Sequence, residues 1–558
     1  MANTTIVFDT PGTVQLVNTQ GALQHRRGQV NIVLVPRPSG DPNDPLSWMQ
    51  KRKTVNIFWA MTWCFFAAAI ISGLSPAYLQ IEADTGISVA DLSTGNGLLF
   101  LFLGWGTLLT QNLALNYGRR PTLVLSMVAM TFINLWSAYT KSRADFFINR
   151  IVMGIVSSPM ETLIEVVIDD LFFVHQRGFY MGLYSWTLWC GALLCPVAAG
   201  FVAETLGWRW IQYILSILGG AISVATFLFF EETMFHRSII QAEITGIVTT
   251  GHRCFESSNI ALDTPPSEIK NPGPEEANLE GLNTINSEVI TAPAPQCAEQ
   301  SADKTFRSKL KLWGYHNSRK SNRFKHALLP FELLRFPSIL FAGVLVGGIL
   351  SWYNVVGGSL ALILGNAPYN FGSSVIGLFY LASVIGVSVG CLISSWASDA
   401  LSVWMASRNR GVMEPEHRLW LGFVAIVAHP AGCILYGVGA SYGIHWTGIA
   451  FGLGIISATL PLGTSLAFTY ILDSFKEVAG EGFVSAIMIR NSMGFAFSYA
   501  VVPMINSIGL RDSFILTAAL GVAFWALCLT MIYFGKHLRR SAAQQYWKLV
   551  EGDGVFGH

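Results

Sequence analysis

The chain is poor in charged residues, which make up only 12% of its 558 residues, whereas hydrophobic residues make up 52%. Soluble domains usually carry about 25% charged residues. The mean hydropathy of +0.46 points in the same direction. A soluble globular protein is therefore excluded, and the formal net charge of +1 gives no support to a nucleic-acid partner.

Motifs of common enzymes and metal proteins are also missing. The patterns GxxxxGK[ST] and HExxH do not occur, so the sequence supports neither ATP-driven pumping nor zinc-dependent hydrolysis. The eight cysteines show no CxxC spacing and fall mostly inside apolar runs. We interpret them as small buried hydrophobic residues and expect no metal site and no cofactor. The chain is not expected to be an enzyme.

Apolar runs long enough to cross a membrane fill most of the chain. A helix needs roughly 20 residues to cross about 30 Å of hydrocarbon. The runs predict an all-α membrane protein with twelve transmembrane helices in two six-helix bundles. We expect the helices at 55–76, 94–113, 122–140, 145–168, 178–203 and 208–230, and at 338–363, 373–396, 418–440, 446–472, 481–505 and 511–535.

A polar stretch, 231–337, separates the two sets of runs. Its middle is rich in Pro, Ser, Glu and Asn and poor in aromatic residues, so we expect a largely disordered linker. The predicted organisation is an N-terminal tail (1–54), a first bundle (55–230), this linker, a second bundle (338–535) and a C-terminal tail (536–558).

Lys and Arg residues are distributed unequally between the two sides of the membrane. If both termini and the linker lie on one side, that side carries 29 of these residues and the opposite side carries four. Without the linker the ratio is still 17 to four. Because positive loops stay in the cytoplasm, we expect both termini and the linker to be cytoplasmic.

Acidic residues inside a membrane span are costly and are candidates for function. The run around 145–168 contains Glu161, Glu165 and Asp169 at spacings of four, which places them on one helical face. Like charges in a medium of low dielectric constant repel one another, so we expect at least one to bind and release a proton near neutral pH. Glu161 is the first choice, because it sits deepest and follows the helix-bending Pro159. Arg150, in the same run, either pairs with a carboxylate or anchors the helix at the interface.

The second half contains further candidates. Arg490 lies well inside its run, where no neighbouring residue explains a buried cation. Trp352, Tyr353 and Asn354 precede two glycines in their run, and an aromatic span interrupted by glycine is a common place for a substrate cavity. We expect His429 to be interfacial, because it lies near the end of its run.

Three segments resemble signatures of one transporter family. NYGRRP (116–121), with Gly118, Arg119 and Arg120, is similar to a cytoplasmic signature loop, although Leu115 stands where the signature has Asp. The segment 398–420, with Asp399 and Arg408, resembles the counterpart of this loop, and GALLCPVAAG (191–200), with Gly191 and Pro196, resembles the antiporter motif. The chain thus resembles the major facilitator superfamily, specifically its fungal drug:proton antiporter-like branch.

The resemblance implies a major facilitator fold in which two bundles rock around a central site, and it implies a proton-linked role for Arg150. Our leading hypothesis is proton-coupled export of a small organic compound, such as a secondary metabolite or xenobiotic. The acidic residues also favour proton-coupled uptake of an organic cation such as a polyamine, and a non-transporting nutrient receptor is a third hypothesis. We expect a monomer in the plasma membrane, with a vacuolar or vesicle membrane as the alternative, and protons and a small molecule as its partners.

The charge distribution gives a testable topology. Epitope tags inserted near Asn286 and at the C-terminus should be shielded in intact cells, whereas a tag near Ser88 should bind antibody from outside. Cleavage of the linker by protease added to intact cells would overturn this orientation.

Overall fold

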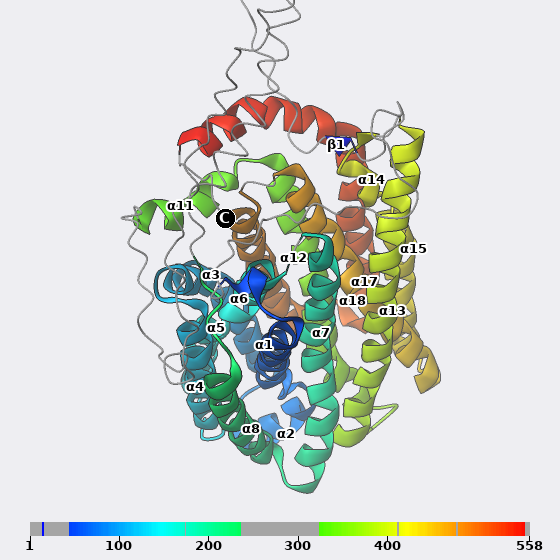
Figure 1. Ribbon diagram of the computed structural model, residues 1–558. Helices are drawn as coiled ribbons and strands as arrows, with labels where there is room; N and C mark the ends of the chain where they lie inside the picture. The colour runs from blue at the N-terminus through cyan, green and yellow to red at the C-terminus, as the bar shows by residue number, and fades with distance from the viewer. Residues whose placement is uncertain are drawn as a thin grey trace, which may run out of the picture.

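Long helices run side by side through the computed structural model, which describes residues 14–15, 44–172, 174–235, 323–409, 412–475 and 478–552 (Figure 1). One end of the molecule carries α11 (Arg323–Leu333), and the opposite end carries α2 (Tyr78–Thr85). We call these the tail end and the far end. Residues 44–235 are called the first half, and residues 323–552 the second half.

The first half is helical almost throughout. Serines cap two of its helices, since Ser88 Oγ accepts a hydrogen bond from Asp91 N and Ser142 Oγ accepts one from Asp145 N, both at 3.2 Å. Besides α2, its elements are η1 (Pro45–Ser47), α1 (Gln50–Ser72), η2 (Ser75–Ala77), α3 (Val89–Tyr117), α4 (Arg119–Ser137), α5 (Arg143–Ser157), α6 (Pro159–Leu171), α7 (Val174–Thr205) and α8 (Trp208–Phe229).

The second half has the same kind of architecture. Beyond α11, its helices are α12 (Pro337–Gly365), α13 (Ser373–Arg408), α14 (Glu416–Leu419), α15 (Gly422–Cys433), the π-helical turn η3 (Ile434–Val438), α16 (Gly439–Ser441), α17 (Trp446–Ser474) and α18 (Ala479–Gly552). The described residues depart from the all-α prediction in one place, where β1 (Val14–Gln15) pairs antiparallel with β2 (Val412–Met413).

Ten segments of the described residues are long and apolar enough to cross a membrane. One of them, Ala479–Leu549, contains two predicted runs, because Gly509 interrupts α18 with a φ of 82° and a ψ of 163°. The remaining predicted run, 122–140, is occupied by α4, which has 19 residues. Helices therefore occupy all the predicted runs, and the all-helical membrane fold is confirmed.

Two pairs of helices join the halves: α3 packs against α18, and α7 packs against α13. Between α3 and α18, Ser93 Oγ donates to Ser498 O at 3.0 Å, and Ser498 Oγ donates back to Ser93 O at 2.6 Å. Between α7 and α13, the backbone at Gly200 lies so close to the carbonyl of Ser373 that no Cβ would fit there. These two helix pairs, which we call the seams, leave space between the halves for the cavity described below.

Residues 536–552 of the predicted C-terminal tail are helical, because α18 continues to Gly552, and this part of the helix lies across the tail end in Figure 1. Arg539 is fully buried there, and its Nε and Nη2 donate to the two carboxylate oxygens of Glu416 at 2.9 and 2.6 Å. Tyr546 is buried in an apolar cluster. An ion pair and an apolar face therefore hold this segment against the second half.

The helix α11 lies inside the range that the sequence assigned to the linker, whereas residues 236–322 lie outside the described residues. The hydroxyl of Ser485 on α18 donates to Pro330 O at 2.7 Å. The ring of Phe331 lies 6.1 Å from the ring of Trp105 on α3, measured between centroids. At the tail end, α11 thus contacts α18 of the second half and α3 of the first half.

The interfacial position predicted for His429 is wrong. Its side chain is 0% exposed, and its ring lies 4.9 Å from that of Trp352 between centroids. The apolar run does not end at this residue, because α15 continues through η3 and α16. His429 therefore belongs to the core of the second half.

Gly509 provides a test of the break in α18. Its backbone conformation is nearly exclusive to glycine, and a Cβ added there would meet no atom within 4 Å, so Gly509→Ala should destabilise the fold by about 1–3 kcal/mol through backbone strain alone. Gly220 in α8 is an equally open but helical control, and Gly220→Ala should be neutral or slightly stabilising. Thermal unfolding of the purified variants measures both effects, and equal shifts would contradict the proposed strain.

Candidate functional site

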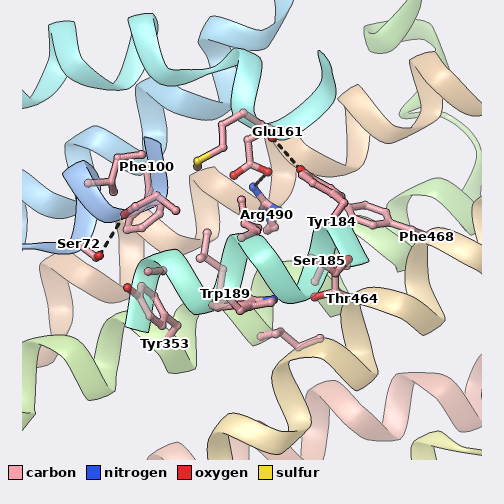
Figure 2. A pocket seen from close by; sticks show the side chains of 18 of the residues that line it. Ser72, Phe100, Glu161, Tyr184, Ser185, Trp189, Tyr353, Thr464, Phe468 and Arg490 are labelled. Carbon is pink, nitrogen blue, oxygen red and sulfur yellow. Dashed lines mark hydrogen bonds and ion pairs between the residues drawn. The ribbon is translucent and has the colours of Figure 1, made fainter. Parts of the chain in front are cut away.

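A cavity lies between the two halves (Figure 2). Its empty space, including the open mouth, is about 790 Å³. Helices α1, α3, α6 and α7 of the first half and α12, α17 and α18 of the second half contribute to its lining. Any molecule bound in it therefore contacts both halves.

An ion pair connects the halves in the wall of this cavity. Glu161 on α6 pairs with Arg490 on α18, and the two side chains point toward each other in Figure 2. Their side chains are only 6% and 9% exposed, respectively. Removing two charges from water costs several kcal/mol per ion, and their mutual attraction offsets this cost only when they are paired. Each half thus supplies the counter-charge that the other half needs.

The break between α5 and α6 positions Glu161. Pro159 has no N–H, so carbonyl groups of the preceding turn lose helical partners. Hydroxyl groups replace these partners: Ser158 Oγ donates to Ile155 O at 2.8 Å, and Ser126 Oγ donates to Val156 O at 2.6 Å. Polar side chains commonly satisfy freed carbonyls in this way at a proline inside a membrane helix.

A tyrosine of α7 fixes the other side of the same turn. The hydroxyl of Tyr184 donates to Met160 O at 2.7 Å, immediately before Glu161 (Figure 2). Tyr184 also lines the cavity. The first turn of α6 is thereby attached to α7, which orients Glu161 toward the second half.

Glu165 lies one helical turn beyond Glu161 and lines the cavity as well. Within the described residues it makes no ion pair, so Arg490 is the one cation of a cavity wall that carries two acidic side chains. Ser72, Ser185 and other hydroxyl groups add further polar contacts. No group of three or more His, Cys, Asp or Glu residues suited to a metal ion occurs in the described part of the chain.

Three aromatic side chains from both halves also line the cavity. The ring of Tyr353 on α12 packs edge-to-face against Trp189 of α7 at 5.5 Å and against Phe100 of α3 at 6.3 Å, between centroids. Such pairs add about 0.5–1.5 kcal/mol beyond the area they bury. This aromatic cluster is a second set of contacts between the halves, and it offers flat apolar surfaces to a ligand.

Of the three cavity residues predicted on α12, only Tyr353 lines the cavity. Trp352 is buried against His429, Phe497 and Phe524, and Asn354 Nδ2 donates to Gly494 O at 3.0 Å. Neighbouring residues on a helix point about 100° apart, so three consecutive side chains cannot all face one cavity. The prediction is therefore wrong for Trp352 and Asn354.

Arg150 satisfies neither interpretation offered from the sequence. It is 3% exposed, its Nη2 donates to Ser137 Oγ at 3.2 Å, and its guanidinium lies 4.9 Å from the ring centroid of Phe146. Among the described residues it has no carboxylate partner, and it does not line the cavity. Arg150 is a buried cation inside the first half, held by a hydroxyl group and an aromatic face.

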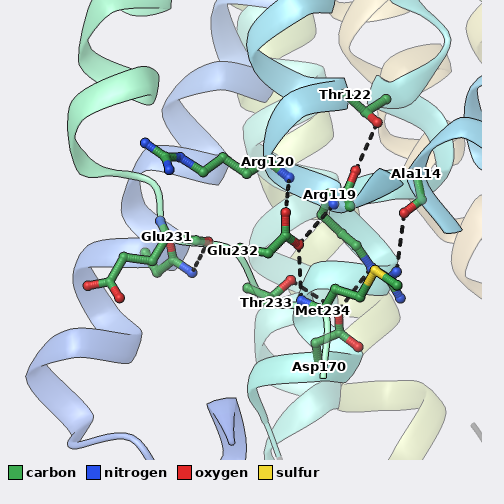
Figure 3. A network of polar contacts seen from close by, with 11 residues as sticks. Ala114, Arg119, Arg120, Thr122, Asp170, Glu231, Glu232, Thr233 and Met234 are labelled. Atoms are coloured by element: carbon green, nitrogen blue, oxygen red, sulfur yellow. Dashed lines mark hydrogen bonds and ion pairs between the residues drawn. The ribbon is translucent and has the colours of Figure 1, made fainter. Parts of the chain in front are cut away.

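The NYGRRP loop is held by acids from two other parts of the first half (Figure 3). Glu232, just after α8, accepts hydrogen bonds from Arg119 N at 2.9 Å and Arg120 N at 3.0 Å, which lie at the start of α4. Arg119 Nε lies 3.2 Å from Asp170 Oδ2 at the end of α6. Gly118, with a φ of 113°, leaves space for the Glu232 carboxylate. Glu232 thus supplies the acid that the loop lacks at position 115.

The counterpart in the second half is only partly described. Arg408 is exposed and stacks over Trp404 at 4.0 Å, and the side chain of Asp399 lies outside the described part of the chain. A different residue makes the main ion pair, since Arg418 Nε lies 2.9 Å from Asp473 Oδ2. Arg418 was not selected from the sequence, where it contributes only to the count of cytoplasmic charges.

The antiporter-like segment places α7 against both α1 and α13. A Cβ at Gly191 would overlap the backbone of Phe65 on α1. Pro196 lies inside α7, and its carbonyl is so close to Gly377 of α13 that this position also tolerates little more than hydrogen. These contacts connect the first half to the second beside the cavity.

Several cavity residues were not found from the sequence. Tyr184, Trp189 and Phe100 are aromatic residues in apolar runs, where most aromatics only pack. A partial signal existed for Tyr184, because a buried tyrosine hydroxyl needs a hydrogen-bond partner.

The chain is similar to known membrane transporters. The sequence profile of the Major Facilitator Superfamily matches residues 61–503. An uncharacterised MFS-type transporter of Schizosaccharomyces pombe is 29% identical, with 98% of this chain and 95% of the relative covered. Protein HOL1 of Saccharomyces cerevisiae is 26% identical, with 98% of each chain covered. The MFS antiporter QDR3 of Candida albicans is 22% identical, with coverages of 91% and 81%.

A solved structure shows the same fold. The human organic anion transporter MFSD10 (TETRAN) superimposes with a TM-score of 0.53 at 13% identity. The match covers 86% of this chain and 100% of that chain.

The Glu161–Arg490 pair predicts unequal effects of its two partners on stability. Arg490→Met leaves two acids without their cation and should lower the free energy of unfolding by about 3–5 kcal/mol. Glu161→Gln should cost less, because Glu165 remains one turn away to pair with Arg490. The double variant Glu161→Gln/Arg490→Met should be more stable than Arg490→Met alone. Thermal unfolding in detergent measures the series.

The exposed Arg511 at the far end is the control, and Arg511→Met should change stability by less than about 1 kcal/mol. A double variant no more stable than Arg490→Met would show that the buried charge of Glu161 does not need Arg490 as its counter-charge.

Proposed function

The chain belongs to the Major Facilitator Superfamily and is a secondary transporter, and on that premise we propose that it couples proton movement to export of a small organic compound by alternating access. The observation that carries the proposal is the Glu161–Arg490 pair, with the second acid Glu165 beside it. In this arrangement the cavity wall carries two carboxylates and one cation, and only Glu161 is paired with that cation. When the halves move apart, the acids lose Arg490 as their counter-charge and bind a proton or a cationic substrate in its place.

The coupling follows from the charges in the cavity. A buried carboxylate separated from Arg490 is strongly disfavoured unless it takes up a proton or a cation. Protonation of an acid therefore substitutes for the ion pair and permits the halves to separate. Release of the proton on the other side favours the pair again.

The exchange mode and the class of substrate are proposed from similarity and from the cavity lining. The Candida albicans relative is an antiporter, which supports exchange of substrate against protons. The aromatic cluster of Phe100, Trp189 and Tyr353 supplies surfaces suited to a flat or apolar compound. A secondary metabolite or xenobiotic fits this chemistry.

Uptake of an organic cation is a second candidate function. It is favoured by Glu165, which lines the cavity without an ion pair among the described residues. An amine of the substrate would replace the proton as its counter-charge. A polyamine has this chemistry.

The proposed setting is a monomer in the plasma membrane with the tail end toward the cytoplasm. Arg119, Arg120 and Arg418 lie at the tail end, together with the positively charged end of α18. This concentration of Lys and Arg supports a cytoplasmic tail end.

Glu161→Gln tests the proposed coupling. If Glu161 exchanges the proton, the variant should lose proton-driven flux but keep proton-independent exchange of substrate. If it binds a cationic substrate instead, both modes should fail and affinity should fall by about 1–3 kcal/mol. Efflux of a fluorescent aromatic dye and uptake of spermidine, measured in cells across a pH series, separate the two outcomes.

The exposed acid Asp512 serves as the control, and Asp512→Asn should transport normally. Normal transport by Glu161→Gln at every pH would show that Glu161 has neither role.

A further inference from the structure

At the far end, an acid of the first half lies on the start of a helix of the second half. Glu204, one residue before the end of α7, accepts a hydrogen bond through Oε2 from Ser374 N at 3.0 Å. Ser374 is the second residue of α13. Gly372 immediately precedes this helix, and a Cβ added to it would lie 3.1 Å from both carboxylate oxygens of Glu204. The glycine leaves this side of the helix start open to the acid.

A carboxylate is favoured at this place for two reasons. The first N–H groups of a helix have no partner within the helix, so Ser374 N needs an external acceptor. The same N–H groups give the helix start a partial positive charge, which stabilises an anion. Glu204 therefore makes an attractive contact that exists only while the far ends of α7 and α13 are together.

Uncharged contacts also join the two halves. The hydroxyl of Tyr380 on α13 donates to Ser75 Oγ of η2 at 3.1 Å. Ser93 and Ser498 exchange hydrogen bonds between α3 and α18. These contacts are uncharged and largely buried, whereas Glu204 is exposed at the rim and charged. Together with the Glu204 contact they join the two halves.

We propose that Glu204 is a latch of the transport cycle: its carboxylate holds the far end closed, and the strength of this contact sets how often that end opens. The inference rests on the proposed alternating access, because a latch requires a state in which the far ends separate. Glu204 does not line the cavity, so it would act on the equilibrium between states and not on substrate binding.

The chain contains a matched control for the latch. Glu82 Oε1 accepts a hydrogen bond from Val89 N at 3.4 Å, at the start of α3. This acid also caps a helix at the far end, but both partners belong to the first half. Loss of the Glu82 cap should therefore affect the first half alone and leave the equilibrium between states unchanged.

The experiment measures the distance across the far end in the full-length protein, reconstituted in lipid nanodiscs. Spin labels are attached to Lys141→Cys in the first half and Ile508→Cys in the second, both exposed, in a background whose native cysteines are replaced by serine. Pulsed electron paramagnetic resonance then gives the ratio of long to short distances. Glu204→Ala should raise this ratio by about three- to tenfold, the effect expected for loss of one charged cap.

The companion variants complete the test. Glu204→Gln should raise the ratio by less, because its amide oxygen still accepts the hydrogen bond but carries no charge. Glu82→Ala should leave the ratio unchanged. A parent protein with two distances, whose ratio is the same in Glu204→Ala, would overturn the latch and leave the proposed transport intact. A single unchanged distance in the parent and in every variant would overturn both.

Discussion

The ion pair between Glu161 and Arg490 is the interaction on which the rest of the site depends. The two charges come from different halves and are almost fully buried, so neither half can neutralise its own charge when the two separate. The break at Pro159, the hydroxyl groups around it and the Tyr184 hydrogen bond all serve to present Glu161 to Arg490. The buried charge of Glu161 is thus stable only while Arg490 is beside it. In the proposed cycle, a proton or another cation must take the place of Arg490 when the halves separate.

Both halves are stabilised at the tail end by ion pairs of their own. Each half carries the same kind of ion pair at the tail end: Arg119 with Asp170 in the first half, and Arg418 with Asp473 in the second. In both cases an arginine near the start of one helix meets an aspartate at the end of another. Glu232 follows the last span of the first half, and Arg539 follows the last span of the second half. Both residues make further polar contacts in the same region. In the proposed transport cycle, motion would then be confined to the contacts between the halves.

The membrane fold could be predicted from apolar runs alone, because a helix in lipid must satisfy its backbone internally and therefore shows its length in the sequence. Glu161, Glu165 and Arg490 could be selected as single residues, because a charge inside a span is unusual. The pairing of Glu161 with Arg490 could not be predicted, since the two residues lie in different halves and no local pattern fixes how the halves face each other. Trp352 and Asn354 were wrongly assigned to the cavity for a related reason. A helix that is apolar on every side carries no periodicity that shows which face is inward.

Proton exchange in the cavity can be observed directly in the infrared difference spectrum of the full-length protein between mildly alkaline and mildly acidic pH. If a cavity carboxylate exchanges a proton, the parent should gain the carbonyl stretch of a protonated carboxylic acid on acidification. This band should be lost or strongly reduced in the double variant Glu161→Gln/Glu165→Gln, which retains the other acids of the chain. An unchanged band in the double variant would contradict proton exchange in the cavity.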